Sequence, residues 1–167
     1  MSIENSYWLV PQRLMAGPYP AGRYTDEQNR QQLEWLIDQG VRHIIDLSKP
    51  DERRGYQTLF ESCCTNFSVQ GSWQRIAITD FGLPSRDTMQ KILDKIDDLM
   101  LDGGVYFHCV AGLGRTGTVA GCWLVRQGMN GEEALRELQI LRSHCTNKHF
   151  FSPETDAQRE FVMRWGK

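Results

Sequence analysis

The sequence predicts an α/β fold: one domain over residues 1–167, with a central, mostly parallel sheet flanked by helices on both faces. Short apolar runs alternate with amphipathic segments, which favours crossover connections between parallel strands. The length of 167 residues suits a single domain with a substantial core. No linker, internal repeat or low-complexity segment divides the chain.

The first elements are an edge strand, a helix and a buried strand. Residues Tyr7–Pro20 are apolar but contain three prolines, so we expect a short edge strand and an ordered lead-in. Thr25 and Gln28 then have the spacing of a capping box, and Gly40 can end the helix that they begin. The run Val41–Ser48 predicts a buried strand.

The middle of the chain repeats this alternation. Residues Tyr56–Phe67 predict a short helix, and Trp73–Asp80 predict a strand that ends at an acid. Ser85 can cap the next helix, whose apolar residues keep the helical period as far as Met100. Two glycines stop this helix before the next apolar run begins.

The last third of the chain adds one strand and three helices. Residues Val105–Cys109 predict a strand, and the helix that follows the next loop ends near Gly128. Asn130 and Glu133 have capping-box spacing for the next helix. The final helix is predicted to begin near Ser152.

Composition restricts the class of protein and its partners. With 40% hydrophobic and 24% charged residues, the chain is globular. Its net charge of -2 gives no reason to expect nucleic acid or stable membrane association. Five cysteines without a regular framework, and no signal peptide or apolar span, lead us to expect a cytoplasmic location. The oligomeric state stays open.

The stretch HCVAGLGRTG, His108–Gly117, carries the strongest chemical signal. Ligands bind at the carboxyl ends of the strands in open α/β sheets, and Cys109 falls there. Gly112 and Gly114 let backbone amides converge on an anion, and the following helix adds the positive end of its dipole. This field favours the thiolate, the nucleophilic form of cysteine. The residues expected to bind phosphate are Val110, Ala111, Gly112, Leu113, Gly114 and Arg115.

Two neighbours of this loop have predicted roles. Thr116 can donate its hydroxyl to the sulfur of Cys109 when the thiolate leaves a phosphoenzyme. On an alternating strand the His108 side chain points away from Cys109. We therefore expect His108 to orient the loop by hydrogen bonding and not to transfer protons.

The run HCVAGLGRT resembles the signature loop of the cysteine-based protein tyrosine phosphatase superfamily. The lead-in RLMAGPYP and the compact length look most like small, prokaryotic-like dual-specificity phosphatases. This resemblance implies a protein tyrosine phosphatase-like fold and hydrolysis through a cysteinyl phosphate, without a metal or other cofactor. It also implies an aspartate on a loop before the cysteine, which acts first as general acid and then as general base.

Asp80 fits the position of that acid. It lies 29 residues before Cys109, after a predicted strand and before the loop FGLP. A plain turn-forming acid is the alternative. Asp87, in the first turn of a helix, is the second candidate, and a structural role is enough to explain it. Asp46, at the end of another strand, is the third, and is better suited to the rim of the site.

Further residues have either a functional or a purely structural role. Gln158 lies in SPETDAQREFV, which resembles the C-terminal part of relatives in which a glutamine positions water; an exposed helix residue is the alternative. Cys63 and Cys64 could trap an oxidised Cys109 as a disulfide, or be buried and inert. Cys122 is expected to pack in the helix behind the loop.

The expected substrate is a phosphorylated protein or peptide, with phosphotyrosine first and phosphoserine or phosphothreonine if the pocket is shallow. Relatives that act on inositol headgroups resemble this loop but carry lysines where this chain has Val110, Ala111 and Leu113. Their absence disfavours phosphoinositides and inositol phosphates, although Arg53 and Arg54 could supply charge.

Two other activities are possible on the same loop. One is a pseudophosphatase that binds phosphopeptides without hydrolysing them; it is disfavoured because the cysteine, the arginine and the acid are all present. The other is a different cysteine chemistry, such as sulfur transfer or arsenate reduction. The Arg-Thr ending and the upstream aspartate argue against it.

Overall fold

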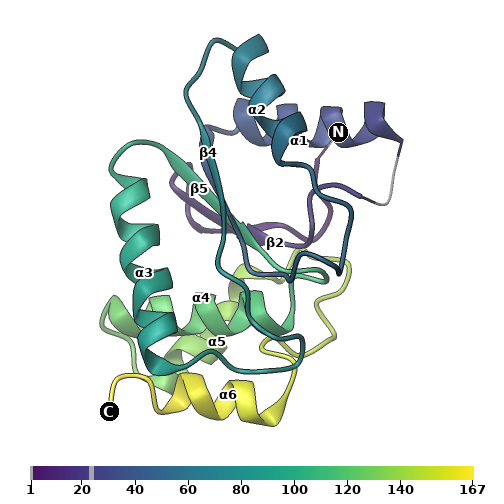
Figure 1. Cartoon of the computed structure of the whole chain (residues 1–167). Helices are drawn as coiled ribbons and strands as arrows, with labels where there is room; N and C mark the ends of the chain where they lie inside the picture. The colour runs from purple at the N-terminus through teal and green to yellow at the C-terminus, as the bar shows by residue number, and fades with distance from the viewer. Residues whose placement is uncertain (1, 23–24) are drawn as a thin grey trace.

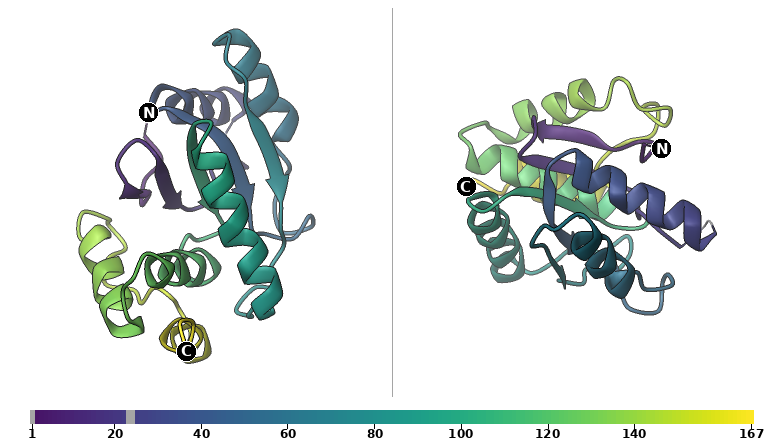
Figure 2. Two further views of the ribbon diagram at one scale, coloured as in Figure 1. Left: turned by 90° about the vertical axis from the view of Figure 1, so that its left-hand side faces the viewer. Right: turned by 90° about the horizontal axis from the view of Figure 1, so that it is seen from above.

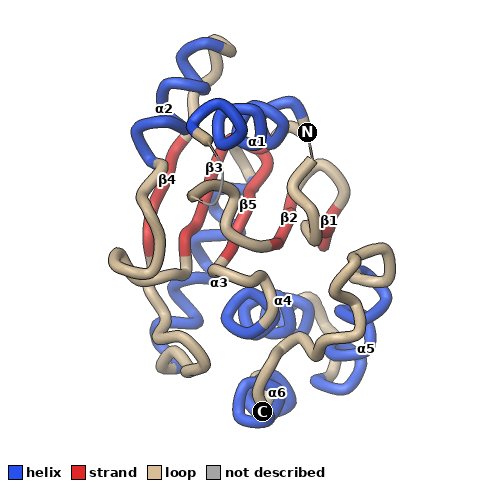
Figure 3. The backbone as a smooth tube through the Cα atoms, turned by 90° about the vertical axis from the view of Figure 1, so that its right-hand side faces the viewer, coloured by secondary structure: helices blue, strands red, loops and turns tan. Residues whose placement is uncertain are grey.

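A five-stranded sheet forms the centre of the computed structural model, which describes residues 2–22 and 25–167. Its strands are β1 Tyr7–Val10, β2 Leu14–Gly17, β3 Val41–Asp46, β4 Ser72–Arg75 and β5 Gly104–His108. Figure 1 shows the sheet within the whole chain, and Figure 3 labels all five strands, which lie in the order β1-β2-β5-β3-β4. Among them only β1 runs antiparallel to its neighbour. The prediction of a mostly parallel sheet is confirmed.

Helices cover both faces of this sheet (Figures 2 and 3). They are α1 Asp26–Asp38, α2 Gln57–Asn66, α3 Arg86–Met100, α4 Gly114–Arg126, α5 Gly131–Leu141 and α6 Asp156–Met163. The first two cover one face and the other four lie on the opposite side, where α6 packs on α4 and α5. Successive side chains of a strand point to opposite faces of the sheet. Ile44 packs in the core with α1 and α2, and Ile45 packs in the core on the opposite face.

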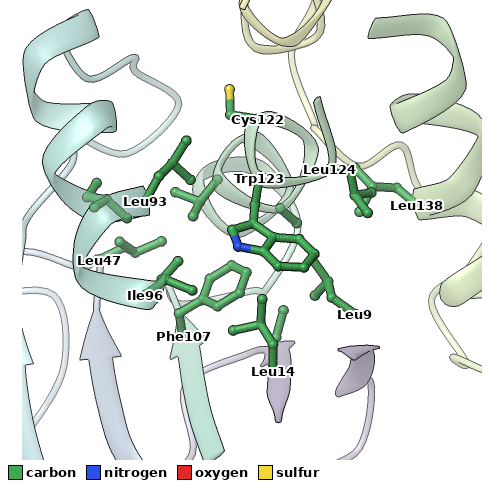
Figure 4. Close-up of a cluster of buried hydrophobic side chains, with 14 of the residues drawn as sticks. Leu9, Leu14, Leu47, Leu93, Ile96, Phe107, Cys122, Trp123, Leu124 and Leu138 are labelled. Carbon is green, nitrogen blue, oxygen red and sulfur yellow. The ribbon is translucent and has the colours of Figure 1, made fainter. Parts of the chain in front are cut away.

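The larger core lies between the sheet and helices α3 to α5. Figure 4 shows Trp123 of α4 directed at Phe107 of β5, with Ile96 of α3 beside them. On the other side of α4, Leu124 lies next to Leu138 of α5. All five side chains are buried, and each contributes about 1.5–3 kcal/mol through removal from water. This packing fixes the start of α4 relative to the end of β5, and therefore the loop between them.

Capping residues define the helix ends that the sequence predicts. Thr25 caps α1 and forms a capping box with Gln28. Asn130 does the same for α5 with Glu133. Ser85 accepts the amide of Thr88 at the start of α3. These predicted helix starts are confirmed. They could be recognised in the sequence because each depends on contacts only three residues apart.

The predicted strand Trp73–Asp80 is too long. Strand β4 ends at Arg75, beside Asp46, where its partner β3 also ends. The amide of Ile76 still donates to the carbonyl of Asp46 at the end of β3, and that of Ile78 to the carbonyl of Leu47, but the regular strand pairing has ended. The acid at position 80 therefore lies on a loop.

Two other boundaries also differ from the prediction. The lead-in after β1 contains β2, which pairs with β5 inside the sheet. The proline that follows at position 18 masks this strand in the sequence. Helix α6 begins at Asp156 and not near Ser152, because Thr155 and Gln158 form its capping box.

Candidate active site

Four parallel strands end at one edge of the sheet. The register pairs Gly17 with His108, His108 with Asp46, and Asp46 with Arg75. The segments that follow these strands, residues 18–22, 47–56, 76–85 and 109–113, therefore meet at this edge. Ligands bind at such an edge in open α/β sheets.

The loop 109–113 curls around the sulfur of Cys109. Cys109 follows β5, is 2% exposed, and accepts the amide of Gly112 at 3.3 Å. Gly112 has φ of +75°, and a Cβ there would lie 2.6 Å from the backbone of Gly17 and Pro18. The amide of Tyr19 also donates to the carbonyl of Val110. The end of β2 thus holds the loop in a shape that only glycine permits.

The start of α4 is uncapped and buried. Its N-cap residue, Leu113, has no side-chain acceptor, and Gly114, Arg115 and Thr116 are buried. The first amides of a helix need partners, and the dipole there favours an anion. This end of α4 lies next to Cys109, so the structure places an anion-binding backbone beside the thiol.

Arg115 supplies a fixed guanidinium to the same place. The side chain is 1% exposed, and its Nη1 donates to Glu52 Oε1 at 2.7 Å and to the carbonyl of Ile78 at 3.1 Å. Its Nη2 donates to Glu52 Oε2 at 2.8 Å. The Nε is buried and has no hydrogen-bond partner within the described part of the chain. Three of the five N–H donors are thus in use, and Nε–H is one of the two that remain for a ligand.

Glu52 is a site residue that the sequence did not reveal. It lies in the charged loop after β3 and is only partly exposed. Hydrogen bonds from Arg115 lower the pKa of its carboxyl, which remains ionised. The order of the strands places this loop beside Cys109, and that order was the one signal that could have pointed to it. The order does not distinguish Glu52 from its neighbour Asp51. The two arginines considered for the rim lie in the same loop, where Arg54 pairs with Asp26 of α1.

Asp80 lies against Arg115 as well. Its Oδ1 is 3.1 Å from Nη2 of Arg115 and accepts the amide of Phe81. The side chain is 54% exposed. Phe81 has φ of +56°, an uncommon conformation for an aromatic residue and one that occurs at functional sites. The structure therefore brings Asp80, Arg115 and Cys109 to one place, as the sequence predicts.

The two other candidate acids are placed differently. Asp46 is fully buried: it accepts the amide and the hydroxyl of Ser48 and pairs with Arg75 at 3.0 Å. It is a structural acid and not part of an open rim. Asp87 is exposed in the first turn of α3.

His108 and Thr116 hold the loop from behind. The His108 Nδ1 lies 2.8 Å from the carbonyl of Cys109, and its Nε2 lies 2.5 Å from the hydroxyl of Tyr56. A carbonyl only accepts, so Nδ1 donates and Nε2 accepts. Burial lowers the pKa of His108, which favours this neutral form. The hydroxyl of Thr116 donates to the carbonyl of Gly17 at 3.4 Å, so the predicted bond to the sulfur is not formed here.

Gln158 joins α6 to the loop that carries Asp80. It is fully buried, which excludes the exposed alternative. Its Oε1 accepts the amides of Glu154 and Thr155, and its Nε2 donates to the carbonyl of Gly82 at 3.2 Å. A Cβ at Gly114 would lie within 3.1 Å of this amide. Gln158 therefore lies between the start of α4 and the Asp80 loop.

The other cysteines do not surround Cys109. Cys63 and Cys64 belong to the core on the α1 and α2 side, whereas Cys109 and Cys122 belong to the opposite core. All are buried free thiols, and burial raises the pKa of Cys63, Cys64 and Cys122. Cys63 and Cys64 therefore pack in a different core from Cys109, which disfavours the disulfide trap and favours the buried alternative.

The described residues lack two features. Residues 2–22 and 25–167 contain no group of three or more His, Cys, Asp or Glu side chains that could hold a metal ion. In the same part of the chain, no helix is both long enough and apolar enough to cross a bilayer.

A family model and curated relatives are similar to this chain. The model described as "Polymorphic toxin system, DSP-PTPase phosphatase" matches residues 20–129. A phosphatidylinositol 3,4,5-trisphosphate 3-phosphatase and protein-tyrosine-phosphatase, PTEN1 of Arabidopsis thaliana, is 30% identical over 98% of this chain and 37% of its own length. The dual specificity protein phosphatase CDC14B of Mus musculus is 28% identical over 81% of this chain and 27% of its own. The chain thus spans about a third of these relatives.

Solved structures share the fold. The active form of Tk-PTP aligns over 97% of this chain and 96% of its own, with a TM-score of 0.73 and 23% identity. The kinase associated phosphatase aligns over 89% and 83%, with a TM-score of 0.70 and 19% identity. PTPMT1 in complex with PI(5)P aligns over 92% and 90%, with a TM-score of 0.66 and 17% identity. The prediction of a protein tyrosine phosphatase-like α/β fold is therefore confirmed.

Proposed function

Since the chain belongs to the DSP-PTPase family of phosphatases, we propose that it hydrolyses phosphotyrosine monoesters in proteins or peptides, with phosphoserine and phosphothreonine as further substrates. The reaction passes through a cysteinyl phosphate. Cys109 is the nucleophile, Arg115 binds the phosphoryl group, and Asp80 is the general acid and base.

The first step transfers the phosphoryl group to the enzyme. The phosphoryl oxygens bind to the amides of residues 110–114 and to the unpaired Nε–H of Arg115. The thiolate of Cys109 attacks phosphorus, the bond from phosphorus to the tyrosine oxygen breaks, and Asp80 gives its proton to that oxygen. An oxygen that also reaches Nη2 of Arg115 displaces Asp80 from its present partner, which frees the acid to face the leaving group.

The second step releases phosphate. Asp80, now a carboxylate, takes a proton from water as the water oxygen attacks phosphorus. The phosphorus–sulfur bond breaks, and the electron pair returns to Cys109 as the thiolate. The positive end of α4 stabilises this leaving group.

One observation carries the proposal: a buried Arg115 with an unpartnered Nε beside an uncapped, buried helix start. The buried Nε–H of Arg115 has no partner among the described residues, and the first amides of a helix have none within the helix, so a bound anion can accept from both. Cys109 lies next to these donors, so a phosphate that they bind has its phosphorus within reach of the Cys109 sulfur.

The residues around the phosphate-binding loop favour an aryl phosphate as the substrate. Phe81 and Leu83, on either side of Gly82 in the Asp80 loop, are 61% and 42% exposed. Apolar side chains beside the acid suit the ring of phosphotyrosine better than a polyhydroxylated inositol. The loop side chains Val110, Ala111 and Leu113 add no positive charge for further phosphates.

Phosphoinositides and inositol phosphates are the second candidate class. The names of the Arabidopsis relative and of the PTPMT1 complex refer to phosphoinositides. In this chain, Arg53 and the exposed Arg54 lie in the loop after β3 and could meet an additional phosphate.

A substrate profile tests the proposal. The purified protein is assayed with p-nitrophenyl phosphate, phosphopeptides, phosphoinositides and inositol polyphosphates. The highest kcat/KM is expected for phosphotyrosine peptides. Cys109→Ser should abolish turnover of every substrate but retain binding of the phosphopeptide. Binding without turnover by the unmodified protein would instead identify a pseudophosphatase, and a higher kcat/KM for an inositol phosphate would favour the second class.

A further inference from the structure

A cavity of about 270 Å³ adjoins the phosphate-binding loop on the side of the N-terminal segment. Val110, Ala111 and Leu113 of the phosphate-binding loop belong to its lining. Glu4 and Gln32 line the same cavity. We propose that this cavity is a substrate subsite that binds a lysine or arginine side chain close to the phosphorylated residue. The inference rests on the proposed phosphatase function and names the class of peptide.

The charge of the lining favours a cationic ligand. None of the described residues that line the cavity is a lysine, arginine or histidine, and Glu4 contributes a carboxylate. The Oε1 of the exposed Glu4 accepts the hydroxyl of Thr146 at 2.9 Å. Since no described lysine, arginine or histidine lines this cavity, the carboxylate there attracts a cationic group and repels a second phosphate.

The lining also contains an unsatisfied hydrogen-bond acceptor. Gln32 of α1 is 6% exposed, and its Oε1 is buried without a hydrogen-bond partner among residues 2–22 and 25–167. A buried acceptor without a donor costs free energy. The last torsion of a glutamine is soft, so a rotation of the amide presents this oxygen to a donor in the cavity. Ammonium and guanidinium groups supply such donors, whereas a phosphate does not.

Aromatic rings complete the cavity. Tyr19 and Phe150 both line it. The rings of tyrosine and phenylalanine attract a cation placed over their faces and also pack on the aliphatic stem of lysine or arginine.

The walls of the cavity are held in place by the fold. Asn5 Oδ1 accepts the amide of Asn147, and the buried Arg142 donates to the carbonyls of Asn147 and Phe150. The guanidinium of Arg142 thus lies behind the wall, with its donors directed to the loop and not to the cavity. Tyr19 is fixed by its amide on Val110 and by its hydroxyl on the carbonyl of Arg54. The cavity is therefore a built feature and not a gap between mobile loops.

A peptide series tests the subsite. Phosphotyrosine peptides carry lysine, alanine or glutamate at each flanking position in turn, and kcat/KM is measured for each. At the best position lysine should exceed alanine by about tenfold, as expected for a hydrogen-bonded charge pair, and glutamate should fall below alanine. The lysine-to-alanine ratio should decline as the salt concentration rises.

Variants connect this ratio to the cavity. Glu4→Gln keeps the acceptor for Thr146 and should reduce the lysine-to-alanine ratio about tenfold, and Glu4→Lys should invert it. Gln32→Leu should lower the ratio by a smaller factor. Glu132→Gln, an exposed acid of α5 remote from the cavity, is the matched control and should leave the ratio unchanged. Thermal unfolding of each variant verifies that it is folded.

Each remaining outcome is decisive. If the protein hydrolyses p-nitrophenyl phosphate and the alanine peptide but shows no preference for lysine, or if Glu4→Gln retains the preference, the subsite is refuted and the phosphatase function stands. If the protein hydrolyses none of these substrates, the proposed function fails and the subsite fails with it. A preference for inositol polyphosphates over every peptide also refutes the subsite.

Discussion

Both carboxylate oxygens of Glu52 accept hydrogen bonds from the guanidinium of Arg115, at 2.7 and 2.8 Å. This two-point contact fixes the plane of the guanidinium and leaves its Nε directed elsewhere. The guanidinium of Arg115 is therefore oriented by the loop that follows β3, the strand next to β5.

Removal of this clamp should weaken phosphate binding. In Glu52→Ala the guanidinium of Arg115 loses its orientation, and we expect kcat/KM to fall about 10- to 100-fold, with weaker inhibition by inorganic phosphate. Asp51→Ala, at the exposed preceding position of the same loop, is the control and should behave like the unmodified protein. Equal kinetics for the two variants would contradict the clamp.

Asp80 should matter most for poor leaving groups. An asparagine cannot donate the proton that the leaving oxygen needs, so Asp80→Asn should lower kcat by about 10²–10⁴ for an alkyl phosphate or a phosphopeptide. The loss should be smaller for p-nitrophenyl phosphate, whose leaving group needs less protonation. Asp87→Asn serves as the comparison. If Asp87→Asn has the larger effect, the acid is misassigned.

The donor of Gln158 should position the acid loop. Gln158→Glu keeps an acceptor for the amides of Glu154 and Thr155 but cannot donate to the carbonyl of Gly82. We expect kcat to fall about tenfold, with a steeper dependence on the leaving group, because the acid is less well placed. Unchanged leaving-group dependence in a folded variant would mean that this contact is only structural.

Stability should fall as the pH is lowered through the usual histidine range. Burial is the main cause that lowers the pKa of both His43 and His108 from 6.5 in the folded chain. Below that pH the unfolded chain binds protons that the folded chain resists, so acid favours unfolding. Each histidine contributes a slope of up to about 1.4 kcal/mol per pH unit.

Urea unfolding between about pH 7.5 and about pH 5.5 measures this slope. Replacement of His43 by glutamine should flatten the curve, since one of the two groups no longer titrates. A free energy of unfolding that stays constant over this range would refute the prediction. Glu52 does not interfere, because its pKa is lowered from 4.5 and its contribution is lost only at more acid pH.

The sequence predicted the elements whose signals are local. The capping boxes at Thr25 and Asn130 and the spacing from Cys109 to Arg115 each depend on residues that are close along the chain, so no fold is needed to recognise them. Strand β2 was missed because its pairing partner, β5, lies about ninety residues away.

The same distinction holds in the site. Asp80 was predicted as the acid because the resemblance gave its approximate distance from the cysteine, and the structure places it against Arg115. Glu52 reaches Arg115 across 63 positions of sequence, and Gln158 reaches Gly82 across 76. Only the order of the strands and the packing of α6 bring these side chains together, and neither can be obtained from spacing.

The contact of Gly112 with the backbone of Gly17 and Pro18 has a consequence for engineering. The loop 109–113 cannot be transferred to another protein alone, because its curvature depends on contact with the end of β2, some ninety residues earlier in the chain. A graft limited to the loop and α4 would carry Cys109 without the strand end that shapes the loop. Transplanting the chemistry to another scaffold would require the hairpin of β1 and β2 as part of the same unit.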